Sequence, residues 1–196
     1  MPQIPFQRII CSAILALSTT FVSAQWTKNS EYRGDKLLSD AKFIEKVKQS
    51  CTDSNDFYSC AINELKVNYY SLFKELRNSK HVTLFEKGDL SIQLIKKQSE
   101  DSEYAYEVLL MTYWKKEKID SMSCYRYSNI PENSVANETI YYISDDFQVW
   151  TLSLEYEEES TIASDWRKRK INPQTGKISE WAKSCDSNKN LKKTAA

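Results

Sequence analysis

The sequence predicts an α+β fold in which a disulfide-stapled N-terminal helical hairpin packs on an antiparallel β-meander of about seven to eight strands. Apolar residues recur at helical spacing up to residue 80 and alternate with polar residues in short β-rich runs after it. Two cysteines lie close together in the helical part. We expect one globular domain over residues 25–196, with the helical hairpin in 35–80, the sheet in 81–185 and a disordered tail in 186–196.

Residues 1–24 have the pattern of a cleaved export signal. Arg8 ends a short basic leader without acidic residues, and the apolar stretch that follows is too short to span a bilayer. Val22 and Ala24 occupy the small-residue positions of a cleavage site. We therefore expect a periplasmic or secreted protein with no integral membrane segment after cleavage.

The cysteine pattern predicts two disulfides in the mature protein. Cleavage would remove one of five cysteines and leave an even number. Cys51 and Cys60 are close in sequence and separated by turn-forming residues, so we expect them to pair, which leaves Cys124 with Cys185. Zinc is disfavoured, because thiolate zinc sites use closer cysteine pairs and the chain has a single histidine.

Two amphipathic helices are predicted before the sheet. The first begins at a capping Ser39 or Asp40 and carries apolar residues at helical spacing. The second keeps one apolar face over residues 58–76, about five turns. The Cys51–Cys60 bridge would then hold the turn between the helices. We interpret the apolar face of the second helix as packing on the sheet.

From residue 81 the sequence predicts strands separated by short turns, so that neighbours in the chain pair antiparallel. The strands are expected at His81–Phe85, Leu90–Lys96, Tyr104–Trp114, Ile119–Tyr127, Thr139–Ile143, Phe147–Tyr156, Ile162–Ile171 and Lys177–Ala182. The longest connector, residues 128–137, is the expected mobile or functional loop.

A register can be argued for the hairpin between residues 147 and 171. Placing Tyr156 opposite Trp166 keeps aromatic side chains together, and it also sets Glu155 opposite Arg167, a favourable charge pair. This register leaves two lysines of the return strand behind apolar residues. We therefore expect a β-bulge there, or a strand that runs past the edge of the core.

Composition argues against several functions. Basic and acidic residues balance at 27 each, which gives no reason to expect a nucleic-acid partner. The chain has three glycines and no glycine-rich phosphate loop, and its single histidine, His81, accompanies no nucleophile motif. We expect no catalytic residue, cofactor or metal. Two acids distant in sequence can still meet in a fold, so an enzyme with carboxylate chemistry stays an alternative.

Twelve tyrosines and five tryptophans point to recognition, because these side chains combine a rigid contact area with a polar tip. We expect an exported binding protein that acts through protein–protein contact, such as a periplasmic inhibitor or a toxin-neutralising immunity protein. The predicted contact residues flank the long connector and are Tyr125, Tyr127, Tyr141 and Tyr142. The alternative is a small-molecule or lipid carrier with an apolar pocket between the helices and the sheet.

Overall fold

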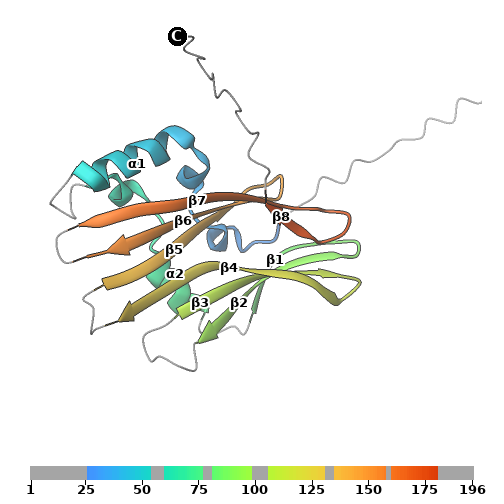
Figure 1. Ribbon diagram of the computed structural model, residues 1–196. Coiled ribbons are helices and arrows are strands. Elements are labelled where there is room, and N and C mark those ends of the chain that lie inside the picture. Colours follow the sequence, from blue (N-terminus) through green and yellow to red (C-terminus); the bar gives the residue numbers. More distant parts are fainter. Residues whose placement is uncertain are drawn as a thin grey trace, which may run out of the picture.

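The computed structural model describes residues 26–53, 60–76, 81–98, 106–130, 135–157 and 160–180. It shows an eight-stranded antiparallel sheet whose strands follow one another in sequence order (Figure 1). Two α-helices of the described part precede the sheet in the chain. The predicted α+β class and the antiparallel meander are confirmed.

Each predicted strand overlaps one strand of the structure. The strands are β1 His81–Lys87, β2 Leu90–Gln98, β3 Tyr106–Trp114, β4 Glu117–Ile130, β5 Val135–Ile143, β6 Gln148–Tyr156, β7 Thr161–Ile171 and β8 Ile178–Glu180. Every strand pairs antiparallel with the next. The alternation of apolar and polar residues therefore predicts the strand positions, because each strand pairs with the next strand in the sequence.

The prediction of a long loop at 128–137 is wrong, because most of this segment is strand. Residues 128–130 pair with residues 135–137 and extend the β4–β5 hairpin. Their backbone groups bond across the hairpin, and this outweighs the low strand propensity of the polar residues. The tip, residues 131–134, lies outside the described residues.

The predicted register of the β6–β7 hairpin is also wrong. Tyr156 lies opposite Thr161 rather than Trp166, since the strands begin to pair directly after a tight connection. The expected bulge is present, because the register shifts between Thr151 and Ser153. One extra residue on β7 lets the return strand stay paired along its whole length.

The charge pair expected between Glu155 and Arg167 is absent for the same reason. Arg167 lies opposite Thr151. It instead contacts Asp165 at 2.6 Å and Glu180 at 3.7 Å, so the basic residue of β7 is neutralised by its own strand and by β8.

Helix α1 (Ala41–Asp53) confirms the first predicted helix. Asp40 caps it, since its carboxylate accepts a hydrogen bond from the backbone N–H of Lys42 at 2.9 Å. The helix lies against β7 (Figure 1). The disulfide between Cys51 and Cys60 is confirmed and joins the helix to the segment that follows.

The second predicted helix is not continuous, so the helical hairpin is not formed as expected. Ala61–Glu64 is a 3₁₀ turn, the backbone is extended at Leu65 and Asn68, and α2 covers only Tyr69–Glu75. Asn68 restarts the helix, because its side chain accepts from the N–H of Ser71 at 2.9 Å.

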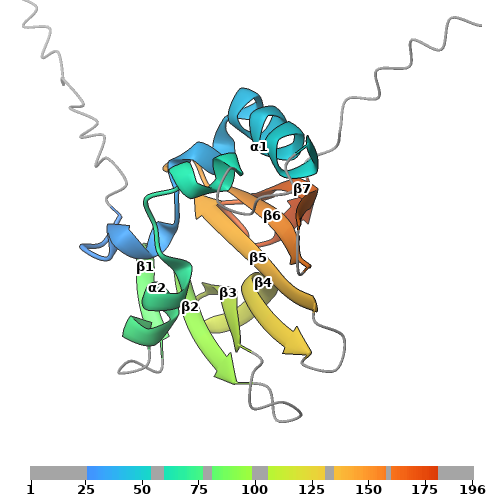
Figure 2. The same cartoon turned by 90° about the vertical axis from the view of Figure 1, so that its left-hand side faces the viewer.

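The physical reason for the interruption is distance. The segment after α1 crosses from the β6–β7 side of the molecule to α2 beside β1 and β2 (Figure 2). Extended chain covers about 3.3 Å per residue, whereas a helix advances about 1.5 Å. An unbroken helix would have the same apolar periodicity but would not reach as far.

Residues 26–35 form an N-terminal strap across the sheet. Trp26 makes an isolated bridge to Phe85 of β1, and Gly34 makes one to Tyr142 of β5. Gly34 has φ +83°, and a Cβ at this position would lie 1.9 Å from a backbone oxygen of β5, so the approach requires glycine. The strap thus ties together strands distant in the sheet.

The sheet curls, which brings its C-terminal turn against its middle. The hydroxyl of Thr112 in β3 donates to the carbonyl oxygen of Gly176. The backbone N–H of Ile178 donates to the carboxylate of Asp120 in β4 at 2.9 Å. The turn before β8 therefore closes one end of the sheet.

Cys124 is a free, fully buried thiol, so the predicted bridge to Cys185 is not formed. Its Sγ donates to the carbonyl oxygen of Val108 at 3.3 Å, and burial raises the pKa of the thiol. A bridge needs a partner Cα within about 7 Å, and Cys124 lies inside the packed sheet. Cys185, the export signal, the cleavage position and the tail lie outside the described residues.

Candidate functional site

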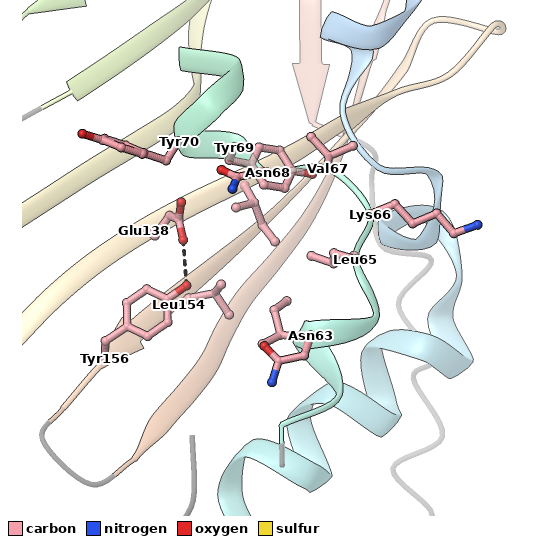
Figure 3. Close-up of a pocket in the computed structure, with 12 residues that line it drawn as sticks. Asn63, Leu65, Lys66, Val67, Asn68, Tyr69, Tyr70, Glu138, Leu154 and Tyr156 are labelled. Carbon is pink, nitrogen blue, oxygen red and sulfur yellow. Dashed lines mark hydrogen bonds between the residues drawn. The ribbon is translucent and has the colours of Figure 1, made fainter. Parts of the chain in front are cut away.

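A pocket of about 380 Å³ lies between the segment 62–70 and strands β5 and β6 (Figure 3). The segment forms its outer wall. Its floor is formed by Glu138, Ile140, Leu154 and Tyr156. The pocket exists because an extended chain, rather than a helix, crosses the sheet at this point.

Glu138 is the charged group on this floor. Its place in β5 sets it on the face shared with Ile140, and it lies opposite Tyr127 on one side and Leu154 on the other. Its Oε2 accepts a hydrogen bond from the hydroxyl of Tyr156 at 2.7 Å (Figure 3). Burial raises the pKa of Glu138, and the hydroxyls of Tyr156 and Tyr125 oppose that shift.

No cation compensates this carboxylate among the described residues, since the ion pairs found there all involve other groups. Lys66 lines the pocket, but its side chain points away from Glu138 (Figure 3). A carboxylate that is partly withdrawn from water without a positive partner costs free energy. The fold therefore retains an unfavourable charge at this point.

Tyr125 directs a second hydroxyl toward Glu138 from β4. Its side chain is 1 % exposed, and its hydroxyl has no hydrogen-bond partner of good geometry among the described residues. Burial, followed by the charge of Glu138, raises the pKa of Tyr125. The carboxylate of Glu138 and the hydroxyl of Tyr125 thus lie close enough to influence each other's pKa.

Aromatic rings continue from the pocket onto the surface. We call Tyr70, Tyr106, Tyr127 and Tyr156 the tyrosine rim. The rings of Tyr106 and Tyr127 stack at 6.1 Å, and Tyr70 meets Tyr106 edge to face at 6.1 Å. Tyr70 is 46 % exposed, which is unusual for an aromatic side chain of this size. The rim therefore offers aromatic contact area beside a polar pocket.

The prediction that four tyrosines contact a partner is wrong for two of them. Tyr125 and Tyr141 are 1 % and 0 % exposed, because both faces of the sheet are covered where they lie. The hydroxyl of Tyr141 donates to the backbone carbonyl of Tyr32 in the strap. Tyr127 is half-buried in the tyrosine rim, whereas Tyr142 is half-buried away from the pocket and stacks on Trp150 at 5.7 Å.

Sequence reasoning did not single out Glu138. The usable signal was the alternation along β5, which places a glutamate on the same face as Ile140 and therefore on a face that is otherwise apolar. An acid at such a position either forms an edge charge or carries a function.

Another hollow, of about 560 Å³, lies at the turns of the β1–β2 and β3–β4 hairpins. Its ionisable side chains have both signs and are exposed, as at Glu86, Lys115 and Lys116. Solvent screens such charges, so we expect them to contribute less binding energy than the half-buried carboxylate of Glu138.

No group of three or more histidine, cysteine or acidic side chains in the described part is placed to hold a metal ion. No described helix is long and apolar enough to cross a membrane. Comparison with known proteins gave no match to a family model, a curated protein or a solved structure.

Proposed function

We propose that this protein is an exported binding protein that acts by contact with another protein rather than by catalysis. The tyrosine rim is the proposed contact surface, and the pocket at Glu138 receives a group of the partner. One observation carries the proposal: exposed aromatic area and a half-buried carboxylate without a described cation partner meet in a single open pocket.

The energetics support contact through the rim. A central aromatic side chain contributes about 2 kcal/mol or more to an interface, whereas an exposed ion pair contributes about 0 to 1 kcal/mol. Tyr70 and Tyr106 already meet edge to face, so little side-chain entropy is lost when a partner covers them. Inhibitors and immunity proteins of the cell envelope work by such contact, and we place this chain in that class.

A site-specific photo-crosslinker tests the proposal. We expect p-benzoylphenylalanine at position 70 to capture one protein from the envelope or secreted fraction of the source cells. The matched control is position 113, a half-buried tyrosine at the opposite end of the sheet strand that carries Tyr106. Capture at 70 that is lost in Tyr106→Ala and Tyr127→Ala supports the proposal. Equal capture at 70 and 113, or none at either, contradicts it.

A second candidate function is a small-molecule carrier, and the size and place of the pocket favour it. A volume of about 380 Å³ lies within the range of small-molecule sites, and the pocket lies between the helical segment and the sheet. The lining is as polar as it is apolar, which suits a polar ligand better than a lipid. Native mass spectrometry distinguishes the two functions: a co-purifying compound that is lost in Leu65→Trp, which fills the pocket, supports the carrier.

A further inference from the structure

We propose that the pocket at Glu138 takes an organic cation, the ammonium group of a lysine side chain presented by the partner protein. This inference rests on the proposed function, because it assigns the chemistry of the group that enters the pocket. It depends on three features of the site: a carboxylate without a described cation partner, tyrosine rings in the pocket lining, and one carboxylate oxygen already occupied by the hydroxyl of Tyr156.

The negative charge of Glu138 favours a cation in the pocket. Glu138 accepts one described hydrogen bond, from Tyr156, and no described cation forms an ion pair with it. A carboxylate has about four acceptor sites, so most of its capacity remains for a ligand. Attraction between opposite charges is stronger in a partly desolvated pocket than in water, and a cation is the ligand that this floor favours most.

The tyrosine rings beside Glu138 also favour a cation. A cation over the face of a tyrosine ring gains about 0.5 to 2 kcal/mol, and more as water is excluded. The same part of the fold already uses this interaction: the Nζ of Lys74 lies 4.2 Å from the ring centre of Tyr70, and the Nζ of Lys96 lies 4.2 Å from that of Phe73. The tyrosine rim beside Glu138 offers further faces for an incoming ammonium.

Hydrogen-bond geometry favours lysine over arginine. A guanidinium binds a carboxylate best through two parallel hydrogen bonds, one to each oxygen. Oε2 of Glu138 is already occupied by the hydroxyl of Tyr156, which obstructs that arrangement. An ammonium has three donors that point in different directions, so it can bind the remaining oxygen without needing both oxygens at once.

Binding of a cation must then depend on the protonation of Glu138. Burial raises the pKa of Glu138 in the free protein, and a bound cation would lower it again. Affinity is therefore full above the pKa of Glu138 and is lost as the pH falls through it. Burial also raises the pKa of Tyr125, Tyr127 and Tyr156, which stay neutral in this range. Other ionisable groups around the pocket are Tyr69, Tyr70, Tyr106 and Lys66, together with Lys74, whose Nζ lies over the ring of Tyr70.

The test is an NMR titration of the mature protein with the capped peptide acetyl-Gly-Lys-Gly-amide. We expect saturable shifts at the tyrosine rim, affinity at least threefold weaker for the arginine peptide, and no binding of the acetyl-lysine peptide. Glu138→Gln should weaken binding at least tenfold. The control is Glu155→Gln, which removes a neighbouring acid from the opposite face of β6.

Equal binding of the lysine and acetyl-lysine peptides, or binding unchanged in Glu138→Gln, overturns the inference. Tyr156→Phe is a second variant, and it should weaken the preference for lysine over arginine because it frees Oε2. Absence of peptide binding together with a specific crosslink at position 70 rejects the lysine assignment but not the proposed function. Peptide binding without any crosslinked protein supports the lysine assignment and rejects the proposed function.

Discussion

Two acidic side chains withdrawn from solvent, on either side of Tyr69, are held in opposite ways. Asp35 is 7 % exposed, and its two oxygens accept from the backbone N–H groups of Leu37 at 2.9 Å and Lys66 at 2.7 Å. Glu138 accepts one described hydrogen bond, from the side chain of Tyr156, and faces a pocket. Backbone donors fix the first carboxylate, whereas the second retains capacity for a ligand.

The difference separates an acid that holds the structure together from an acid of the candidate site in the same part of the fold. Asp35 joins the strap to the extended segment, while its own N–H donates to the hydroxyl of Tyr69 at 3.2 Å. That hydroxyl donates in turn to the carbonyl oxygen of Tyr141 in β5. Asp35 thereby positions the pocket wall opposite Glu138. A buried acid with all its partners stabilises a fold, and one with too few indicates a site.

The largest effect should follow the loss of Asp35. Asp35→Ala leaves the N–H groups of Leu37 and Lys66 without acceptors, and each unpaired buried donor costs about 1 to 3 kcal/mol. We expect the free energy of unfolding, measured in urea, to fall by about 4 kcal/mol. A loss below about 1 kcal/mol would show that water replaces the carboxylate and that Asp35 is not the structural member of the pair.

The disulfide holds the other end of the same segment. Cys60→Ser removes the link to α1, and loss of a native bridge in a small disulfide-bonded domain costs about 2 to 5 kcal/mol. We expect a decrease of about 3 kcal/mol with the same readout. Unchanged urea stability of the oxidised and reduced wild type would contradict this and leave Asp35 as the main anchor of the segment.

Tyr69→Phe tests the connection between the two acids. The substitution removes the donor to the carbonyl of Tyr141 and the acceptor for the N–H of Asp35, so we expect a loss of about 2 kcal/mol. Thermal unfolding by circular dichroism measures it. Tyr70→Phe is the control, because Tyr70 is exposed and should lose less than about 0.5 kcal/mol.

The smallest expected change in stability is an increase, and it follows the loss of the charge of Glu138. Because the pKa of Glu138 is raised in the folded state, folding binds a proton, and stability decreases as the pH rises from the unfolded pKa through the folded one. Glu138→Gln removes this penalty, so we expect an increase in Tm of about 2 °C at pH 7 and no increase near pH 3. A decrease in Tm at pH 7 would show that the carboxylate stabilises the fold as Asp35 does.

The sequence predicted the sheet well, because alternation and turn residues act over a few positions. The prediction failed where contacts between residues distant in the sequence determine the structure. The periodicity of residues 58–76 cannot show that the segment must cross the sheet, and the register of β6 and β7 depends on a bulge at Thr151. Strand alternation shows which tyrosines share a face but not which faces are covered, so Tyr125 and Tyr141 were misplaced and Glu138 was missed.

The N-terminal strap imposes an order on folding. The meander forms by pairing neighbours, and such local contacts form early and quickly. The strap residues Trp26 and Gly34 instead bridge to Phe85 and Tyr142, which leave the ribosome long after them. Until β5 has been synthesised, Gly34 has no strand to pair with. Gly34 precedes the whole sheet in the chain, yet its contact with β5 is therefore among the last native contacts of the strap to form.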